Sequence, residues 1–335
     1  MLIVLLGVSL TLLSWNNTTT EVESIEIPEG WPEPLYDFEK NPITHEGFVL
    51  GRKLFHDPLL SRDGTISCAS CHSQYNGFTH VDHAVSHGID DRKGTRNSPV
   101  LINLAWNNSF HWDGGVNNLE VQPLNPLSHP AEMDQSLDKV LEYLNQDEAY
   151  RSLFFQAFGD SVVSSKNVLL ALAQFNASLV SSNSRYDKFM RDELEFTKQE
   201  KKGLKLFMKH CNSCHTAPLF NSNKYASNGL PIDTVYNDVG RFKITGNPED
   251  SLKFRIPTLR NIAYTFPYMH DGRFKKLRQV VAYYAGEIDL ENPYLSNELR
   301  KKIKLSSNDQ KDLISFLLTL TDKEFLFNNK FELPK

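Results

Sequence analysis

Apolar residues spaced three or four positions apart recur in two parts of the chain. The first set consists of Val168, Leu172, Phe175 and Leu179. The second set consists of Leu313, Phe316, Leu317 and Leu320. This spacing places each set on one face of a helix, so the sequence predicts two amphipathic helices, one near the middle of the chain and one near its end.

Two capping boxes predict where further helices begin. Thr197 is followed three residues later by Glu200, which predicts a helix that runs towards His210. Ser307 and Gln310 have the same spacing, and they predict the start of the helix that carries the second apolar set.

A short internal repeat precedes both pairs of cysteines. Residues 51–55 (GRKLF) stand ahead of Cys68, and residues 203–207 (GLKLF) stand ahead of Cys211. Five matching positions are a weak signal alone, but their recurrence before both cysteine pairs indicates a duplicated unit.

The predicted fold is mainly α. No strand run of any length appears, and the stretches between the helices are rich in Asn, Asp, Gly and Pro. We expect two domains packed together with long irregular loops, covering residues 43–185 and 186–325 and meeting near residues 183–195.

The N-terminus predicts export. Residues 2–13 are almost wholly apolar, which is too short for a membrane span and suits a signal peptide over residues 1–20. An uncleaved N-terminal anchor is the alternative. Residues 21–42 are polar, acidic and broken by prolines, so we expect a flexible tether outside any core.

Composition narrows the class of partner. The 335 residues are 40% hydrophobic and 23% charged, as in a globular protein, and the formal net charge is −5. This charge argues against a nucleic-acid partner and leaves open a weakly charged or cationic protein partner.

All four cysteines lie in two Cys-x-x-Cys-His sequences, which is the attachment motif for c-type haem. The residues are Cys68, Cys71 and His72, and Cys211, Cys214 and His215. Two thiols at this spacing reach the two vinyl groups of a porphyrin, and the histidine then supplies the proximal nitrogen to the iron. The sequence therefore predicts one covalent haem in each domain.

Two other uses of the cysteines are possible. A Cys₄ zinc site usually has its pairs about 15–20 residues apart, whereas Cys71 and Cys211 are far apart. Two disulfides would suit an exported protein, but they leave the histidine after each pair unexplained.

With these motifs in place, the chain resembles the bacterial di-haem cytochrome c peroxidase family, which includes the MauG-type oxygen-activating enzymes. The resemblance runs from about residue 51 to residue 320. Its marks are GRKLFHDP (51–58), SCASCH (67–72), RNSP (96–99), HWDG (111–114), Gln122, PAEM (130–133), RIPTLRN (255–261) and PYMHDG (267–272). The resemblance implies that the N-terminal haem reacts with peroxide and that the C-terminal haem passes electrons to it.

Three catalytic residues follow from the resemblance. Glu132 matches the distal carboxylate that moves a proton between the peroxide oxygens, and Gln122 matches the polar residue near it. Trp112 matches the tryptophan between the two haems. Alternatively, Glu132 is a surface acid without a catalytic role, and Trp112 is a buried aromatic residue without a redox role.

The resemblance also indicates the sixth ligands of the irons. His87 matches a removable distal histidine, with His80 and His83 as rivals. At the second haem the peroxidases have a methionine where this chain has Tyr284, as the MauG-type enzymes do. We expect Tyr284 to ligate this iron as a hard anionic donor, with Met269 as the alternative.

A calcium ion is also implied by the resemblance. Asn97, Thr265 and Pro267 match positions whose backbone carbonyls hold the ion between the domains, and carbonyl oxygens suit this hard cation.

The leading functional hypothesis is a periplasmic peroxidase that reduces hydrogen peroxide with electrons from a small c-type cytochrome or a copper protein. One alternative is a MauG-like oxidase acting on a protein or another substrate. The other is a plain electron carrier with both irons permanently six-coordinate. A homodimer is possible from the resemblance.

Overall fold

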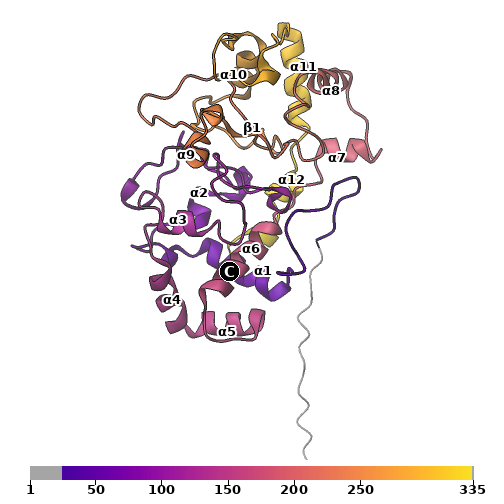
Figure 1. The fold of residues 1–335 in the computed structure, drawn as a ribbon. Coiled ribbons are helices and arrows are strands. Elements are labelled where there is room, and N and C mark those ends of the chain that lie inside the picture. The colour runs from indigo at the N-terminus through magenta and orange to yellow at the C-terminus, as the bar shows by residue number, and fades with distance from the viewer. Residues whose placement is uncertain (1–24, 334–335) are drawn as a thin grey trace, which may run out of the picture.

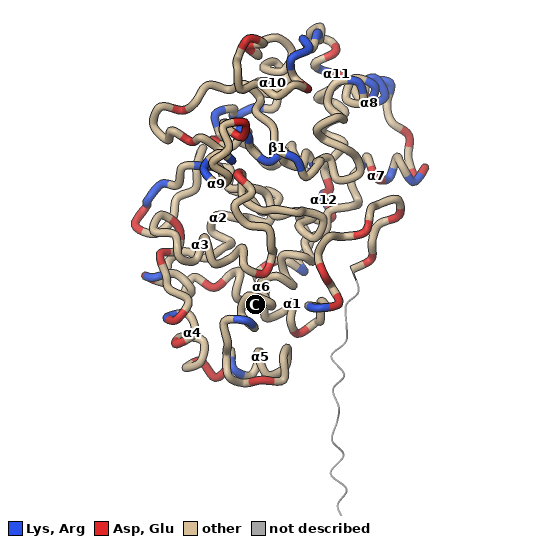
Figure 2. The backbone as a smooth tube through the Cα atoms, viewed as in Figure 1, with Lys and Arg blue, Asp and Glu red and all other residues tan. Residues whose placement is uncertain are grey.

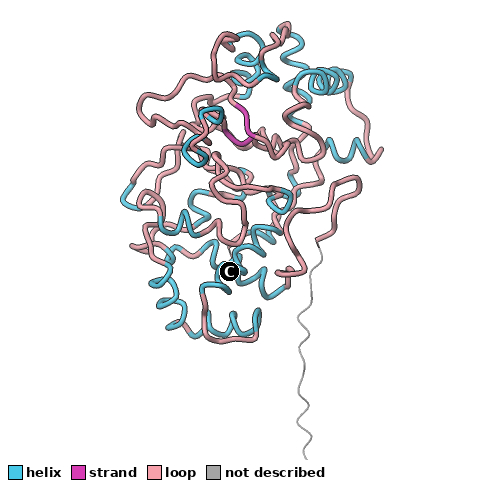
Figure 3. Tube along the Cα trace, viewed as in Figure 1, coloured by secondary structure: helices cyan, strands magenta, loops and turns pink. Residues whose placement is uncertain are grey.

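The computed structural model describes residues 25–333, and most of its regular structure is helical. The helices of the first half are α1 (His45–His56), α2 (Cys68–Cys71), α3 (Leu124–Ser128), α4 (Leu137–Gln146), α5 (Glu148–Phe158) and α6 (Ser165–Ala177). Long loops separate them (Figure 3). The predicted signal peptide lies outside the described residues, and within residues 25–333 no helix is long and apolar enough to cross a membrane.

The second half repeats this character. Its helices are α7 (Arg185–Met190), α8 (Lys198–His210), α9 (Phe242–Thr245), α10 (Leu277–Ala282), α11 (Ser307–Leu318) and α12 (Lys323–Leu326). Two-residue strands β1 (Tyr225–Ala226) and β2 (Phe254–Arg255) pair antiparallel, with Tyr225 opposite Arg255. The predicted mainly α fold is confirmed.

The first half is built on α1 crossing α6 (Figure 1). A side chain at Gly51 would collide with the backbone carbonyl of Ala171, so glycine permits this close approach. Phe55 of α1 then packs on Phe175 of α6, with ring centroids 5.0 Å apart. Both rings are buried in a hydrophobic cluster that belongs mainly to the first half.

The second half uses the same crossing between α8 and α11. A side chain at Gly203 would collide with the carbonyl of Asp312, which is the counterpart of the Gly51 contact. Phe207 packs on Phe316 with centroids 5.0 Å apart, again as Phe55 does on Phe175. The internal repeat therefore marks a helix pair that is built twice.

The caps agree with the sequence at one site and differ at the other. Thr197 and Glu200 form the predicted capping box at the start of α8. The box at α11 is formed by Ser306 and Asp309, one residue earlier than predicted. Ser306 has the extended backbone that an N-cap needs, and its amide donates to the Asp309 carboxylate at 2.9 Å.

The tether prediction is wrong for residues 25–42. Trp31, Tyr36 and Phe38 pack against the first hydrophobic cluster. The indole Nε1 of the buried Trp106 donates to the carbonyl of Pro32 at 2.7 Å, which fixes the segment to the body. Proline content therefore indicated irregular backbone correctly, but the aromatic residues between the prolines bury themselves.

The two halves have separate apolar clusters but are tied together. The second cluster draws its buried residues from 186–320, whereas Phe325, Leu326 and Phe331 return to the first. The Asn261 side chain accepts a hydrogen bond from the backbone amide of Asp322 at 2.7 Å and donates one to the hydroxyl of Ser181 at 3.0 Å. The division at 185/186 remains a prediction.

Candidate functional site

The first haem motif forms the short helix α2 and the residue after it. Cys68 and Cys71 are the two ends of α2, and His72 follows directly. The His72 Nδ1 lies 2.8 Å from the carbonyl of Phe78. Burial lowers the pKa of His72 to about 4, so the imidazole is neutral at pH 7. With Nδ1 donating to Phe78, Nε2 is the nitrogen that can bind iron.

The second motif follows α8 and is held in the same way. The His215 Nδ1 lies 3.1 Å from the carbonyl of Pro257 and 3.3 Å from that of Phe220. Burial lowers the pKa of His215 to about 4 and raises that of the Cys211 thiol to about 12. Both motifs therefore present a neutral, oriented histidine beside two thiols.

The alternative uses of the cysteines do not fit this geometry. No disulfide joins the cysteines of either pair. The two pairs belong to different halves of the molecule. Within residues 25–333, no group of three or more His, Cys, Asp or Glu side chains is arranged to hold a metal ion.

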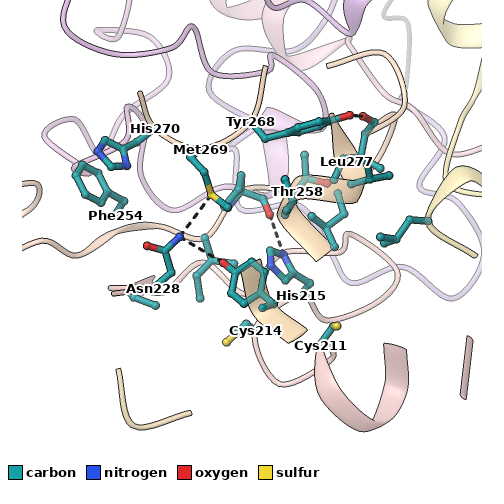
Figure 4. Close-up of a pocket in the computed structure, with 18 of the residues that line it drawn as sticks. Cys211, Cys214, His215, Asn228, Phe254, Thr258, Tyr268, Met269, His270 and Leu277 are labelled. Atoms are coloured by element: carbon teal, nitrogen blue, oxygen red, sulfur yellow. Dashed lines mark hydrogen bonds between the residues drawn. The ribbon is translucent and has the colours of Figure 1, made fainter. Parts of the chain in front are cut away.

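A large cavity beside His215 fits a porphyrin (Figure 4). Its apolar wall includes Ile262, Leu277, Val281, Leu313 and Leu317, and Cys211 and Cys214 lie on its lining. Such a wall suits the porphyrin plane, and the two thiols supply its covalent attachment.

Arg255 lines the same cavity and was missed as a functional residue in the sequence. Arg255 is only 7% exposed, and its guanidinium donates a hydrogen bond to the carbonyl of His111 at 3.4 Å. Within residues 25–333 it forms no ion pair, and burial lowers its pKa. A buried cation without a carboxylate suits the acidic side groups of a haem.

Both predicted ligands of the second iron lie on this cavity. Met269 and Tyr284 line it, together with His215. The Asn228 side-chain amide donates to the Met269 sulfur and to the Tyr284 hydroxyl, each at 3.4 Å (Figure 4). Tyr284 lies in a π-helical turn, a feature often found at functional sites.

Tyr284 needs a positive charge nearby before it can act as a phenolate. Burial raises the pKa of Tyr284 to about 12, so the phenol keeps its proton at neutral pH without a cation. A ferric iron is such a cation, since metals deprotonate their ligands. The thioether of Met269 needs no deprotonation.

Trp112 lies where the two halves meet. Its indole Nε1 donates to the carbonyl of Asn97 at 2.8 Å, and its own carbonyl accepts from the amide of Arg255 at 2.7 Å. Trp112 also lines the cavity beside His215. Asn97, Thr265 and Pro267, the predicted calcium residues, line this cavity too, so the fold brings them together without testing ligation.

Glu132 lies near the first haem motif. Burial raises the pKa of the Cys71 thiol to about 11 and that of the Cys68 thiol to about 12, and the charge of Glu132 raises both further. Burial raises the pKa of Glu132 itself. The charge of His129, whose Nδ1 lies 3.7 Å from the Glu132 Oε1, partly offsets this rise. Gln122 is half-buried in the turn before α3, where its carbonyl accepts from Asn125.

The three loop histidines form one group beside the first motif. The His87 ring stacks on His83 with centroids 4.2 Å apart, and His83 Nδ1 lies 3.4 Å from His80 Nε2. The His87 Nδ1 contacts Asp91 at 2.7 Å, and its carbonyl accepts from the Cys71 thiol at 3.6 Å. The structure therefore does not separate His87 from its rivals.

Backbone contacts hold the loop that carries His87 against the segment that carries Glu132. The amide of Ile89 donates to the carbonyl of Glu132 at 2.8 Å. A side chain at Gly88 would collide with the backbone of Ala131 and Glu132, so the loop needs glycine there. The histidine loop and Glu132 thus form one side of the first site.

Comparisons with known proteins agree with this architecture. A family profile described as di-haem cytochrome c peroxidase matches residues 45–195, and a cytochrome c profile matches residues 200–321. The methylamine utilization protein MauG of Methylorubrum extorquens is 36% identical, over 88% of this chain and 82% of the relative. The cytochrome c551 peroxidase of Nitrosomonas europaea is 34% identical, over 86% and 84%.

A solved structure is similar over almost its whole length. It is a MauG-like protein associated with microbial copper homeostasis, with a TM-score of 0.87 and 32% identity, covering 93% of this chain and 99% of that one. The chain is therefore an oxidoreductase of the di-haem cytochrome c peroxidase family, which includes MauG relatives, and it has two c-type haems.

Proposed function

We propose that the His72 site reduces hydrogen peroxide and that the His215 site receives the electrons for it. The observation that carries this proposal is the difference between the two sites. Glu132 lies near Cys71, whereas Met269 and Tyr284 line the cavity beside His215. A movable proton suits peroxide cleavage, and a closed set of iron ligands suits electron storage.

A haem held by Cys68, Cys71 and His72 would supply an iron that exchanges single electrons. Glu132 accepts the proton of the near peroxide oxygen and returns it to the far one, so that the second oxygen leaves as water. Reduction of one peroxide to two waters uses two protons and two electrons. Two donor molecules, each losing one electron, supply these electrons.

The two sites communicate through Trp112 and Arg255 in this proposal. Trp112 contacts Asn97 on one side and Arg255 on the other, and both Trp112 and Arg255 line the second cavity. The buried guanidinium of Arg255 would hold the acidic side groups of a haem bound beside His215. Trp112 would supply an aromatic group for electron transfer between the two sites.

Tyr284 would bind the iron of the second haem through its hydroxyl oxygen, since it lines the cavity beside His215. Asn228 can donate to its oxygen whether it is a phenol or a phenolate, and this bond strengthens as negative charge develops. A phenolate favours ferric iron and lowers its reduction potential, whereas methionine would raise it.

Tyr284 also favours a second candidate function, a MauG-like oxidase that uses peroxide to oxidise a partner protein or another substrate. The MauG relatives at 36% and 31% identity are consistent with it. The proposal also includes export to the periplasm and a calcium ion held by Asn97, Thr265 and Pro267. The electron donor would be a small cytochrome or cupredoxin, and the enzyme would be a homodimer.

Steady-state turnover of hydrogen peroxide with reduced cytochrome c tests the proposal, before and after partial reduction of the enzyme. Turnover in either state supports peroxide reduction. Oxidation of another substrate without cytochrome turnover would favour the oxidase. No turnover in either state, with no spectral change on adding peroxide, would contradict both and leave an electron carrier.

A further inference from the structure

Positive charge is concentrated in the part of the chain that holds the second haem motif. Residues 198–304 contain 19 of the 36 Lys and Arg residues but only 10 of the 41 Asp and Glu residues. Their formal charge is therefore +9 in a chain whose net charge is −5. Figure 2 shows Lys and Arg on α8 and beside α11, at one end of the molecule.

Two segments at this end form a basic rim. Its members are Lys202, Lys205 and Lys209 of α8, and Arg300, Lys301, Lys302 and Lys304 before α11, all of them exposed. The Arg300 guanidinium donates to backbone carbonyls of Leu290 and Asn292 rather than to a carboxylate. Within residues 25–333, no ion pair is formed by Lys205, Lys209, Lys301 or Lys302.

The basic rim borders the cavity beside His215. His210 and Cys211, at the end of α8, line this cavity, and so do Leu299 and Ile303 from the other segment. Lys301 and Lys302 line a small cleft that shares Tyr284, Leu299 and Ile303 with the cavity. The uncompensated charge therefore lies beside the haem that receives electrons.

We propose that the basic rim docks an acidic electron-donor protein, so the partner is a small redox protein with negative charge around its metal site. This inference rests on the proposed entry of electrons at the His215 site. In each encounter the donor's reduced metal loses one electron and the ferric haem iron gains it. The acidic partner differs from the cationic one that the net charge of −5 leaves open.

Electrostatic steering explains what the rim contributes. Exposed charges add little to the stability of a bound complex, but complementary charges raise the rate of productive encounters about 10- to 1,000-fold at low salt. An electron donor has to bind, transfer one electron and leave, so fast association is more useful here than tight binding.

The test is the rate at which reduced donors reduce the His215 haem of the holoenzyme, measured by stopped flow without peroxide. The donors are a reduced acidic 2Fe–2S ferredoxin, whose low potential drives electrons onto a phenolate-ligated haem, and the same ferredoxin with its carboxylates amidated. The variant is Lys205→Glu, Lys209→Glu, Lys301→Glu and Lys302→Glu combined. The control is Arg151→Glu with Lys166→Glu, two exposed residues of α5 and α6 in the first half of the chain.

We expect the acidic donor to react faster at low salt, and the charge-reversed variant to lose about 10- to 100-fold of this rate. The control should stay within about twofold. If the acidic donor reduces the rim variant as fast as it reduces the wild type, the proposal is overturned. Binding of anionic lipid vesicles to the basic rim would not rescue it. Because no peroxide is present, loss of peroxide turnover alone would count against the proposed function and not against the docking surface.

Discussion

The two haem sites share a frame and differ in what surrounds it. Each is reached from a helix that crosses a partner helix at a glycine, Gly51 in one half and Gly203 in the other. Each presents a histidine whose Nδ1 is fixed by a backbone carbonyl. The helix pair and the motif were duplicated, but the loops that complete each site were not.

The loops decide the chemistry. Beside Cys71 they supply Glu132 and the histidine group of His87, His83 and His80. Beside His215 they supply Tyr284 and Asn228. A fold built from two similar halves can therefore separate peroxide chemistry from electron storage without changing its core.

Replacing Tyr284 should change the second site most. In Tyr284→Met, a neutral thioether replaces an anionic donor, so we expect the reduction potential of that haem to rise by a few tenths of a volt, roughly, within the range that axial ligands span. A spectroelectrochemical titration measures this shift. Tyr294→Phe at an exposed position is the control, and equal potentials for wild type and Tyr284→Met would exclude Tyr284 as the ligand.

The matching change at the first site is Glu132→Gln. The amide cannot accept the peroxide proton, so we expect kcat for peroxide to fall about 10²- to 10⁴-fold. Both haems should remain attached, which the absorption spectrum checks. Glu142→Gln on exposed α4 should keep full activity. If Glu132→Gln were equally active, the first site would not depend on this carboxylate.

The pH profile distinguishes the two sites further. Burial raises the pKa of Glu132, and the carboxylate must be ionised to accept a proton. Turnover should therefore fall as pH drops through this raised pKa, at an inflection above the ordinary carboxyl value of about 4.3, by about tenfold per pH unit below it. The rate at which the donor reduces the His215 haem should lack this inflection. The peroxide turnover of the Glu132→Gln variant should lack it too.

Substitution of the crossing glycines tests what the halves share. Gly51→Ala and Gly203→Ala each place a methyl group against a carbonyl of the partner helix, so each should lower the free energy of unfolding by about 1–3 kcal/mol. Urea unfolding measures the loss. Gln199→Ala on exposed α8 should stay within about 0.5 kcal/mol. A loss in one half only would contradict the duplicated frame.

The smallest expected effect belongs to Asn228→Leu. This change removes two hydrogen bonds, one of them to Tyr284, each worth about 0.5–1.5 kcal/mol. The second haem's potential should shift by less than about 0.1 V while the first haem's stays fixed. Asn117→Leu at an exposed position of the first half is the control. Equal shifts at both haems would indicate a general loss of structure instead.

The sequence predicted the parts of this account that depend on local pattern. Helix faces follow from periodicity, and both haem motifs follow from the fixed spacing of two thiols and a histidine. The burial of Trp31 was missed, because its packing depends on residues such as Trp106 far along the chain. The cap at Ser306 was misplaced because Ser307 offered a similar pattern one residue later.

Arg255 and Asn228 show the same limit in the candidate site. Asn228 and Tyr284 are 56 residues apart, and nothing in the local sequence indicates that their side chains meet. Arg255 stood in a recognised motif, but its importance comes from being buried without a carboxylate, which only the packed structure shows. Side chains that act through distant contacts are therefore found last.

The central claim, that the two haems are inequivalent, is tested most directly by a redox-poised absorption and EPR titration of the intact protein. We expect two haems with well-separated potentials. The one at higher potential should change its spectrum with peroxide, and the other should be low-spin without the red charge-transfer band of methionine-ligated ferric haem. Two haems with one potential, the same ligands and no response to peroxide would contradict the account.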